Sequence, residues 1–298
     1  MTRITLLLAG AALAVATHAR AAEETPHPPR QAWSFAGVFG TYDRAQLQRG
    51  FKIFRESCQN CHSLSRVYFR NLSQPGGPEF SAAQVQALAA EYKIKDGPND
   101  AGDMFERPGR AADRIPPPFP NEQAAAAANG GKAPPDLSVM AKARTYERGF
   151  PGFVLDALPV PYIGMYQEQG PDYLTALLNG YVDPPQGFEV PSGGNYNLYF
   201  PGHIIAMPKP LNDGQIEYAK GEDGKPVVPE TTEQYAKDNT AFLMWTAEPH
   251  LEQRKRLGFE VIGYLAFLGV LLFLTKKKVW GRVGGDPVGL LPEAQQRH

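Results

Sequence analysis

The stretch Cys58-Gln59-Asn60-Cys61-His62 contains both cysteines of this 298-residue chain. Two thiols separated by two residues can form a disulfide, supply half of a metal site, or attach a prosthetic group. In the pattern C-x-x-C-H, both sulfurs reach one edge of a porphyrin and add across its two vinyl groups, and the adjacent imidazole lies beneath the iron. Cys58 and Cys61 are therefore predicted to hold one haem c covalently, with His62 as an axial iron ligand.

The cysteine pair has two other interpretations. A thioredoxin-like dithiol would follow a strand in a βαβ unit, whereas Thr41 to Cys58 has the apolar spacing of an amphipathic helix, with Asp43 as its N-cap. A zinc site would need further cysteine or histidine ligands at regular spacing. The histidines that follow the N-terminal segment are instead scattered, at His27, His62, His203, His250 and His298.

A haem iron held by one histidine needs a sixth ligand or an open site. The candidates are Met104, Met140, Met165, Met207, Met244 and His203. Met207 is preferred because it lies in H-I-I-A-M-P-K-P-L, where prolines stiffen the backbone and isoleucines can seal the haem face; Met165 is the alternative. A thioether ligand favours ferrous iron and raises the reduction potential. Six-coordinate iron has no position for substrate, so outer-sphere electron transfer is expected.

The N-terminus has the pattern of a secretory signal. Arg3 precedes an apolar run from Ile4 to Val15, which is too short to span a bilayer, and Ala19-Arg20-Ala21 fits a small-x-small cleavage site. Residues 1–21 are therefore predicted to be a signal peptide, with the mature chain beginning near Ala22. An uncleaved anchor is the alternative.

A second apolar run, Leu257 to Leu274, would span about 27 Å as a helix, close to the hydrocarbon thickness of a bilayer. Lys276 to Lys278 and Trp280 follow it as interface anchors do. These flanks argue against a buried core helix. Because the chain is exported, residues 22–256 are predicted to be periplasmic, 257–275 to cross the membrane and 276–298 to be cytoplasmic.

The formal net charge of −1 hides an acidic exported region. Residues 22–253 contain 28 Asp and Glu against 20 Lys and Arg, a net charge of −8. This argues against nucleic acid as a partner and favours a basic soluble protein. Candidate acidic stretches are Asp96 to Glu106 and Glu217 to Glu233.

The remaining pattern indicates a mainly helical domain with long loops. Proline and glycine are plentiful, and residues 93–135 and 184–225 are expected to be mostly loop. Thr231 to Trp245 is the clearest soluble helix, with a capping box from Thr231 to Gln234 and a polar side that includes Asp238. Other helices are expected at Ser81–Tyr92, Asn121–Asn129, Leu137–Arg144 and Asp172–Asn179.

Several segments together resemble cytochrome c1, the haem subunit of the ubiquinol–cytochrome c oxidoreductase (cytochrome bc1) complex. They occur in the family's order and cover nearly the whole mature chain. They are W-S-F-x-G at 33–37, R-G-F-K-I-F-R-E-S-C-Q-N-C-H-S at 49–63, D-G-P-N at 96–99, M-F-E-R-P-G at 104–109, A-N-G-G-K-A-P-P-D-L-S at 128–138, N-G-Y-V-D-P-P at 179–185, N-L-Y-F-P-G-H-I-I-A-M-P at 197–208 and W-T-A-E-P-H-L-E-Q-R-K-R-L-G at 245–258.

The resemblance implies a class I cytochrome c-like domain with a C-terminal transmembrane helix in a bacterial inner membrane. It implies thioethers at Cys58 and Cys61 and iron ligation by His62 and Met207. It also implies that Arg144 meets a haem propionate, for which a solvated surface charge is the alternative. The aromatic positions it places near the haem are Tyr173 and Tyr181.

The same resemblance implies partners and a role. The chain would be an electron carrier and not an enzyme by itself, in a dimeric complex with cytochrome b and a Rieske iron–sulfur protein, passing electrons to a soluble basic cytochrome c. An added segment between Arg144 and Asp172 departs from the mitochondrial pattern and contains Met165. Two rival functions are another membrane-anchored c-type cytochrome that feeds a terminal oxidase or reductase, and a haem-based sensor with an open iron site.

Overall fold

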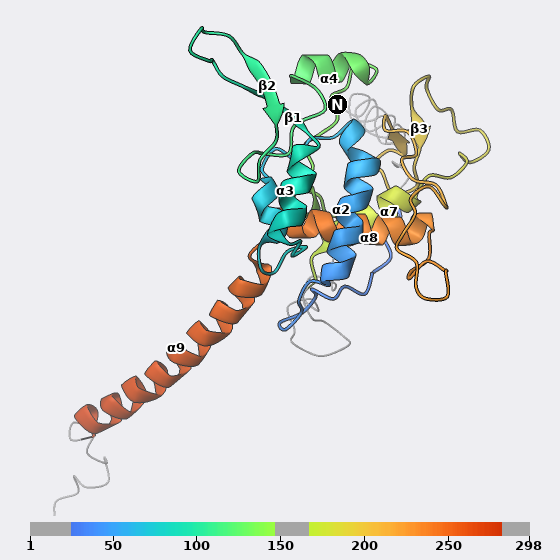
Figure 1. Cartoon of the computed structure of the whole chain (residues 1–298). Coiled ribbons are helices and arrows are strands. Elements are labelled where there is room, and N and C mark those ends of the chain that lie inside the picture. The colour runs from blue at the N-terminus through green and yellow to red at the C-terminus, as the bar shows by residue number, and fades with distance from the viewer. Residues whose placement is uncertain (1–24, 147–166, 282–298) are drawn as a thin grey trace, which may run out of the picture. The chain divides into compact units, whose positions relative to one another are not determined.

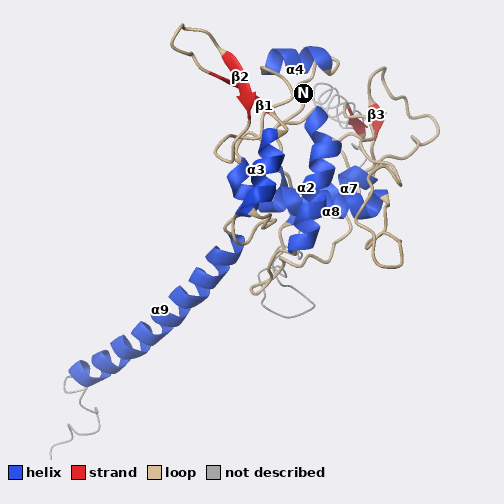
Figure 2. Cartoon of the chain, viewed as in Figure 1, coloured by secondary structure: helices blue, strands red, loops and turns tan. Residues whose placement is uncertain are grey.

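The computed structural model describes residues 25–146 and 167–281, and the description that follows concerns these residues. Helices dominate, joined by long loops and a few short strands (Figure 2), which confirms the predicted fold class. The predicted signal peptide, Met165 and most of the tail at 276–298 lie outside the described residues. The chain divides into two units, Met1–Pro249 and His250–His298, and each is described by itself.

Helix α2, Arg44–Glu56, places the cysteine motif. The Asp43 carboxylate caps it by accepting a hydrogen bond from the backbone N–H of Gln46 at 3.2 Å. The helix ends at Ser57, and a single 3-10 turn, η1 (Cys58–Asn60), follows at once. The predicted helix is thus confirmed, and its C-terminal end delivers the first cysteine.

Helix α2 crosses the buried helix α8, Thr232–Ala247 (Figure 1). Gly50 permits the close approach, because a Cβ added there would lie 2.1 Å from the Asp238 carbonyl oxygen. The rings of Phe51 and Phe54 pack on Phe242, with centroids 5.6 and 6.0 Å apart. Aromatic burial of this kind contributes about 1.5–3 kcal/mol per side chain, so the crossing is a main part of the core.

Two expectations for α8 are wrong. Asp238 does not lie on a polar side, because its side chain is fully buried against Arg49 of α2. The capping box is half formed: Thr231 accepts from the Gln234 N–H at 3.4 Å, but the Gln234 side chain donates to Asp238. The Gln234 amide binds the buried Asp238 carboxylate instead of the backbone of the N-cap residue.

Four shorter helices confirm the expected segments with trimmed or extended ends, and one 3-10 helix, η2, is not predicted by the sequence pattern. Ser81 and Gln84 form a full capping box at the start of α3. Asn121 caps α4 by accepting from the Ala124 N–H at 2.8 Å. The bounds are α3 Ala82–Ala90, α4 Glu122–Ala128, α5 Met140–Ala143, α7 Gln169–Asn179 and the 3-10 helix η2 Phe69–Ser73.

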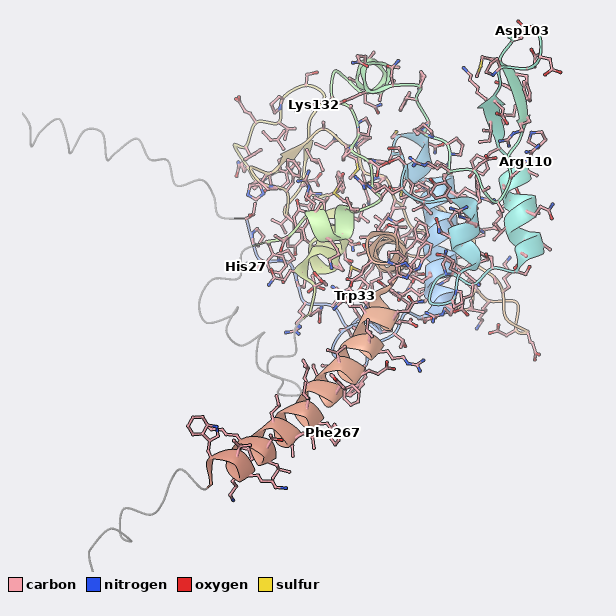
Figure 3. All side chains as sticks on the ribbon, turned by 90° about the vertical axis from the view of Figure 1, so that its left-hand side faces the viewer. His27, Trp33, Asp103, Arg110, Lys132 and Phe267 are labelled. Carbon is pink, nitrogen blue, oxygen red and sulfur yellow. The ribbon has the colours of Figure 1, made fainter. Side chains whose placement is uncertain are left out.

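The segment expected to be mostly loop after α3 contains an antiparallel hairpin, β1 (Lys93–Asp96) and β2 (Phe105–Pro108). The guanidinium of Arg107 fixes it by bonding Asp96 on β1 and Asp113 beyond β2, the latter at 2.6 and 2.9 Å. In Figure 3, Asp103 lies at the hairpin tip. A second small pair joins β3 (Asn195–Tyr196) to β4 (Ile204–Ile205).

In the second unit, α9 (Leu251–Trp280) is the one helix among the described residues that is long and apolar enough to cross a membrane. It is about 45 Å long and contains the predicted span. Figure 3 shows its side chains, Phe267 among them, projecting around the helix. Helix α8 ends at Ala247 and α9 begins two residues beyond Pro249, as the proline predicts.

Candidate haem site

Both thiols of the motif are free, and their surroundings differ. Cys58 is buried beside Asn239, whereas Cys61 is exposed. Burial, and then the charge of Cys61, raise the pKa of the Cys58 thiol to about 12. A thiol with a raised pKa is a poor nucleophile, so Cys58 is not suited to be the attacking thiol of a thioredoxin-like exchange. Within residues 25–146 and 167–281, no group of three or more metal-binding side chains includes the pair.

His62 is oriented for metal ligation. Its Nδ1 lies 2.8 Å from the Pro135 carbonyl oxygen, and because a carbonyl only accepts, Nδ1 carries the proton. The lone pair of Nε2 is then available to a metal, and a backbone carbonyl on the other nitrogen is the usual support for a ligating histidine. Burial lowers the pKa of His62, although the Pro135 hydrogen bond and the Asp136 charge oppose this, so the imidazole is neutral as a ligand requires.

Asp136 holds this supporting carbonyl in place. Its carboxylate accepts hydrogen bonds from the Ser63 hydroxyl and from the backbone N–H groups of Ser65 and Ser138, each at 2.8 Å. Burial by itself would raise the pKa of Asp136, but these hydrogen bonds outweigh it and bring the pKa to about 2. The P-P-D-L-S motif is recognisable in the sequence, but the roles of Pro135 and Asp136 beside His62 are seen only in the structure.

Met207 follows β4 and is half-buried. Its carbonyl accepts a hydrogen bond from the Tyr181 hydroxyl at 3.1 Å. Three residues on, the Pro210 carbonyl accepts from the Ser57 hydroxyl at 2.9 Å. The side chain packs on one apolar cluster, which consists of Ile53, Leu178, Leu211, Ile216, Tyr218, Tyr235 and Ala236. The structure therefore brings Met207 beside the end of the helix that delivers Cys58.

The other candidate ligands lie in different settings. Met104 is 65% exposed near the hairpin tip, and Met244 is fully buried within α8. Met140 is buried at the start of α5. His203 is buried with its ring stacked on Tyr196 at 5.4 Å. The Met207 segment differs from these in being bonded, through the Pro210 carbonyl, to Ser57, the residue next to the first cysteine.

Arg144 and Tyr173 lie near each other. Tyr173 is buried on α7, and burial raises its pKa while the charge of Arg144 partly opposes the rise. Arg144 is the exposed C-cap residue of α5, and its side chain has no ion pair among the residues the structure describes. The Arg144 guanidinium is therefore available to bind a carboxylate of a ligand.

The donor set fits a covalently bound haem: two adjacent free thiols, an imidazole whose Nε2 is aimed by a carbonyl bond to Nδ1, and a thioether on a braced segment. Together with the mainly helical fold and α9, it defines a class, the membrane-anchored c-type cytochromes.

Comparison with known proteins is consistent with this class. The sequence model of the Cytochrome C1 family matches residues 33–283. The chain is 49% identical over 259 residues to the cytochrome c1 of Blastochloris viridis, covering 86% of this chain and 87% of the relative. It is 44% identical over 291 residues to the cytochrome c1 of Rhodospirillum rubrum, covering 92% and 95%.

A longer relative, "Cytochrome b/c1" of Bradyrhizobium diazoefficiens, is 58% identical over 279 residues. The match covers 93% of this chain but 39% of that relative. The chain belongs to the cytochrome c1 family. It is therefore a haem c electron carrier of the cytochrome bc1 complex, which contains cytochrome b and the Rieske protein, and it is not an enzyme by itself.

Proposed function

We propose that this chain passes single electrons from a Rieske iron–sulfur protein to a soluble basic cytochrome c, within a dimeric bc1 complex of a bacterial inner membrane. The observation that carries the proposal is the family match over residues 33–283, which spans the cysteine motif, the Met207 segment and α9. A haem supplies one-electron ferric–ferrous chemistry at one fixed point of the chain. The domain at 22–256 is periplasmic and follows a signal peptide at 1–21; the tail at 276–298 is cytoplasmic.

The side chains have distinct roles in this proposal. Cys58 and Cys61 would hold the haem through thioethers, and His62 and Met207 would be the iron ligands. A neutral imidazole and a thioether add no charge, which favours the reduced state. Arg144 would compensate a haem propionate, since a buried carboxylate needs a cationic partner. Tyr173 and Tyr181 would lie near the haem, an assignment that rests on the family resemblance.

The acidic surface provides the steering of a basic partner. In the hairpin, Asp100 and Asp103 are exposed, while Asp96 is engaged by Arg107. In the second acidic stretch, Glu222 and Asp223 are exposed. Exposed charges of one sign raise the association rate with an oppositely charged protein, and salt screens the effect.

Purification of the membrane complex tests the proposed path of electron transfer. Cytochrome b and a Rieske protein should copurify with this chain, and quinol should reduce its haem only when the Rieske protein is present. The rate of electron transfer to a basic cytochrome c should fall as ionic strength rises. Purification without these partners would favour a direct donor to a terminal oxidase, and a salt-independent rate would contradict steering.

The Met207→Leu variant tests the sixth ligand. Loss of the low-spin spectrum and a large fall in midpoint potential are expected, because leucine cannot donate to iron. An unchanged spectrum would move the ligand to Met165 or another residue. Carbon monoxide binding by the reduced native protein would favour a sensor with an open site.

A further inference from the structure

The backbone around Met207 is held by side chains. Pro208 and Pro210 lack an N–H and cannot donate to a neighbouring strand. The Tyr181 hydroxyl bonds the Met207 carbonyl at 3.1 Å, and the Ser57 hydroxyl bonds the Pro210 carbonyl at 2.9 Å. The segment from 207 to 210, called the Met207 strap below, is thus fixed at both of its ends.

Tyr181 is itself held firmly. It lies two residues beyond the end of α7 and pairs with Asn197 in a β-bridge. Asn197 is fully buried and its side chain donates to the Leu177 carbonyl of α7 at 2.8 Å. Burial raises the pKa of the Tyr181 hydroxyl, which therefore remains a protonated donor at physiological pH. The Tyr181 hydroxyl is therefore a firmly positioned hydrogen-bond donor to the Met207 carbonyl.

Ser57 connects the Met207 strap to the end of helix α2. It is the C-cap residue of α2, directly before Cys58. Its hydrogen bond to Pro210 joins the residue next to the first thiol with the strap that carries the thioether. Ile53, one turn earlier in α2, belongs to the apolar cluster on which Met207 packs. The cysteine motif and the Met207 strap are therefore both attached to helix α2.

We propose that Tyr181 and Ser57 are positioning residues that hold the Met207 thioether at the iron and so keep the sixth position closed. The inference rests on the proposed ligand role of Met207. Each hydrogen bond contributes roughly twofold to tenfold to the equilibrium between methionine-bound and methionine-free iron. The role of Tyr181 is thus exerted through its hydroxyl, beyond any contact of its ring with the haem.

Three variants of the full haem-loaded chain in its complex test this. Tyr181→Phe and Ser57→Ala each remove one hydroxyl, and Ser57→Thr keeps it. The expected results for the first two are a weaker methionine–iron absorption band, a lower midpoint potential and roughly twofold to tenfold more carbon monoxide bound by the reduced protein. Ser57→Thr should match the native protein in all three readouts.

Tyr42→Phe is the matched control. The Tyr42 hydroxyl also donates to backbone carbonyls, those of Met244 at 3.3 Å and Glu248 at 3.1 Å, but at the end of α8 and not in the strap. This variant should lose thermal stability and keep the native band and potential.

The outcomes separate this inference from the ligand assignment. If Met207→Leu abolishes the methionine–iron band while Tyr181→Phe and Ser57→Ala leave band, potential and carbon monoxide binding unchanged, the positioning role is wrong. If Tyr42→Phe lowers the potential as much as Tyr181→Phe does, the effect is general destabilisation and the positioning role is also wrong. If Met207→Leu itself leaves the band intact, the ligand assignment fails.

Discussion

Nε of Arg49 lies 2.7 Å from Oδ2 of Asp238, and this ion pair joins α2 to α8. The Asp238 side chain is fully buried, and that of Arg49 is largely so. Three further donors reach the same carboxylate: Gln46 at 3.1 Å, Gln234 at 2.9 Å and Tyr218 at 2.8 Å. A buried charge is tolerated when it is paired and its remaining lone pairs are bonded, and both conditions hold here.

Removing this carboxylate should destabilise the domain strongly. Asp238→Ala is expected to lower the free energy of unfolding by about 3–5 kcal/mol, because Arg49 loses its counter-charge within the helix crossing. Denaturant unfolding of the purified chain measures the change.

An exposed ion pair between α2 and the C-cap residue of α3 provides the control. Arg55 of α2 lies 3.1 Å from Glu91, whose side chain is 60% exposed. Glu91→Ala should lower the free energy of unfolding by under about 1 kcal/mol, since exposed ion pairs contribute little. Equal losses in the two variants would contradict the structural role given to Asp238.

Asp136 should make stability depend on acidity. Its pKa in the folded chain is about 2, below the ordinary value for an aspartate, so folding favours the ionised form. The contribution is fully present above the unfolded pKa of about 4 and is lost as the pH falls through the folded value. For this half-exposed group, about 1–2 kcal/mol is expected after screening by solvent.

Asp136→Asn isolates that contribution. The free energy of unfolding of the native chain should exceed that of the variant at pH 7, and the difference should shrink between pH 4 and pH 2. Unfolding curves of both proteins across this range measure it. A difference that stays constant with pH would mean that the Asp136 carboxylate stabilises the fold by some means other than its charge.

The membrane attachment of the chain should depend on α9. A chain ending at Pro249 lacks the second unit and should appear in the soluble exported fraction with its haem attached. A chain ending at Gly281 retains α9 and should remain with the membranes. Fractionation of cells that lack cytochrome b and the Rieske protein makes the comparison, and a membrane-bound chain ending at Pro249 would show a second attachment site.

Local sequence patterns predicted what local physics determines. The sequence predicts α2 from its apolar spacing and its cap, and α9 from its long apolar run. It also predicts the break between α8 and α9 from the proline there. The β1–β2 hairpin was missed because neither strand has a buried apolar alternation, and the side chain of Arg107 fixes it by bonding Asp96 and Asp113.

Partners that are far apart in the sequence could not be predicted from local patterns. Asp238 has the spacing of a surface residue, and only the crossing with α2 reveals that it is buried. The link from Ser57 to Pro210 joins residues 153 positions apart, and nothing in either local segment indicates it. Motifs in the sequence name the candidate donor residues, whereas the residues that orient them are recognised only in the structure.

The covalent bond between the chain and its haem is the claim on which the rest depends. Denatured protein extracted with acidified acetone tests it most directly. The red pigment is expected to stay with the polypeptide, and mass analysis is expected to find haem on the peptide containing Cys58 and Cys61. Colourless polypeptide, with the pigment in the acetone, would contradict the account.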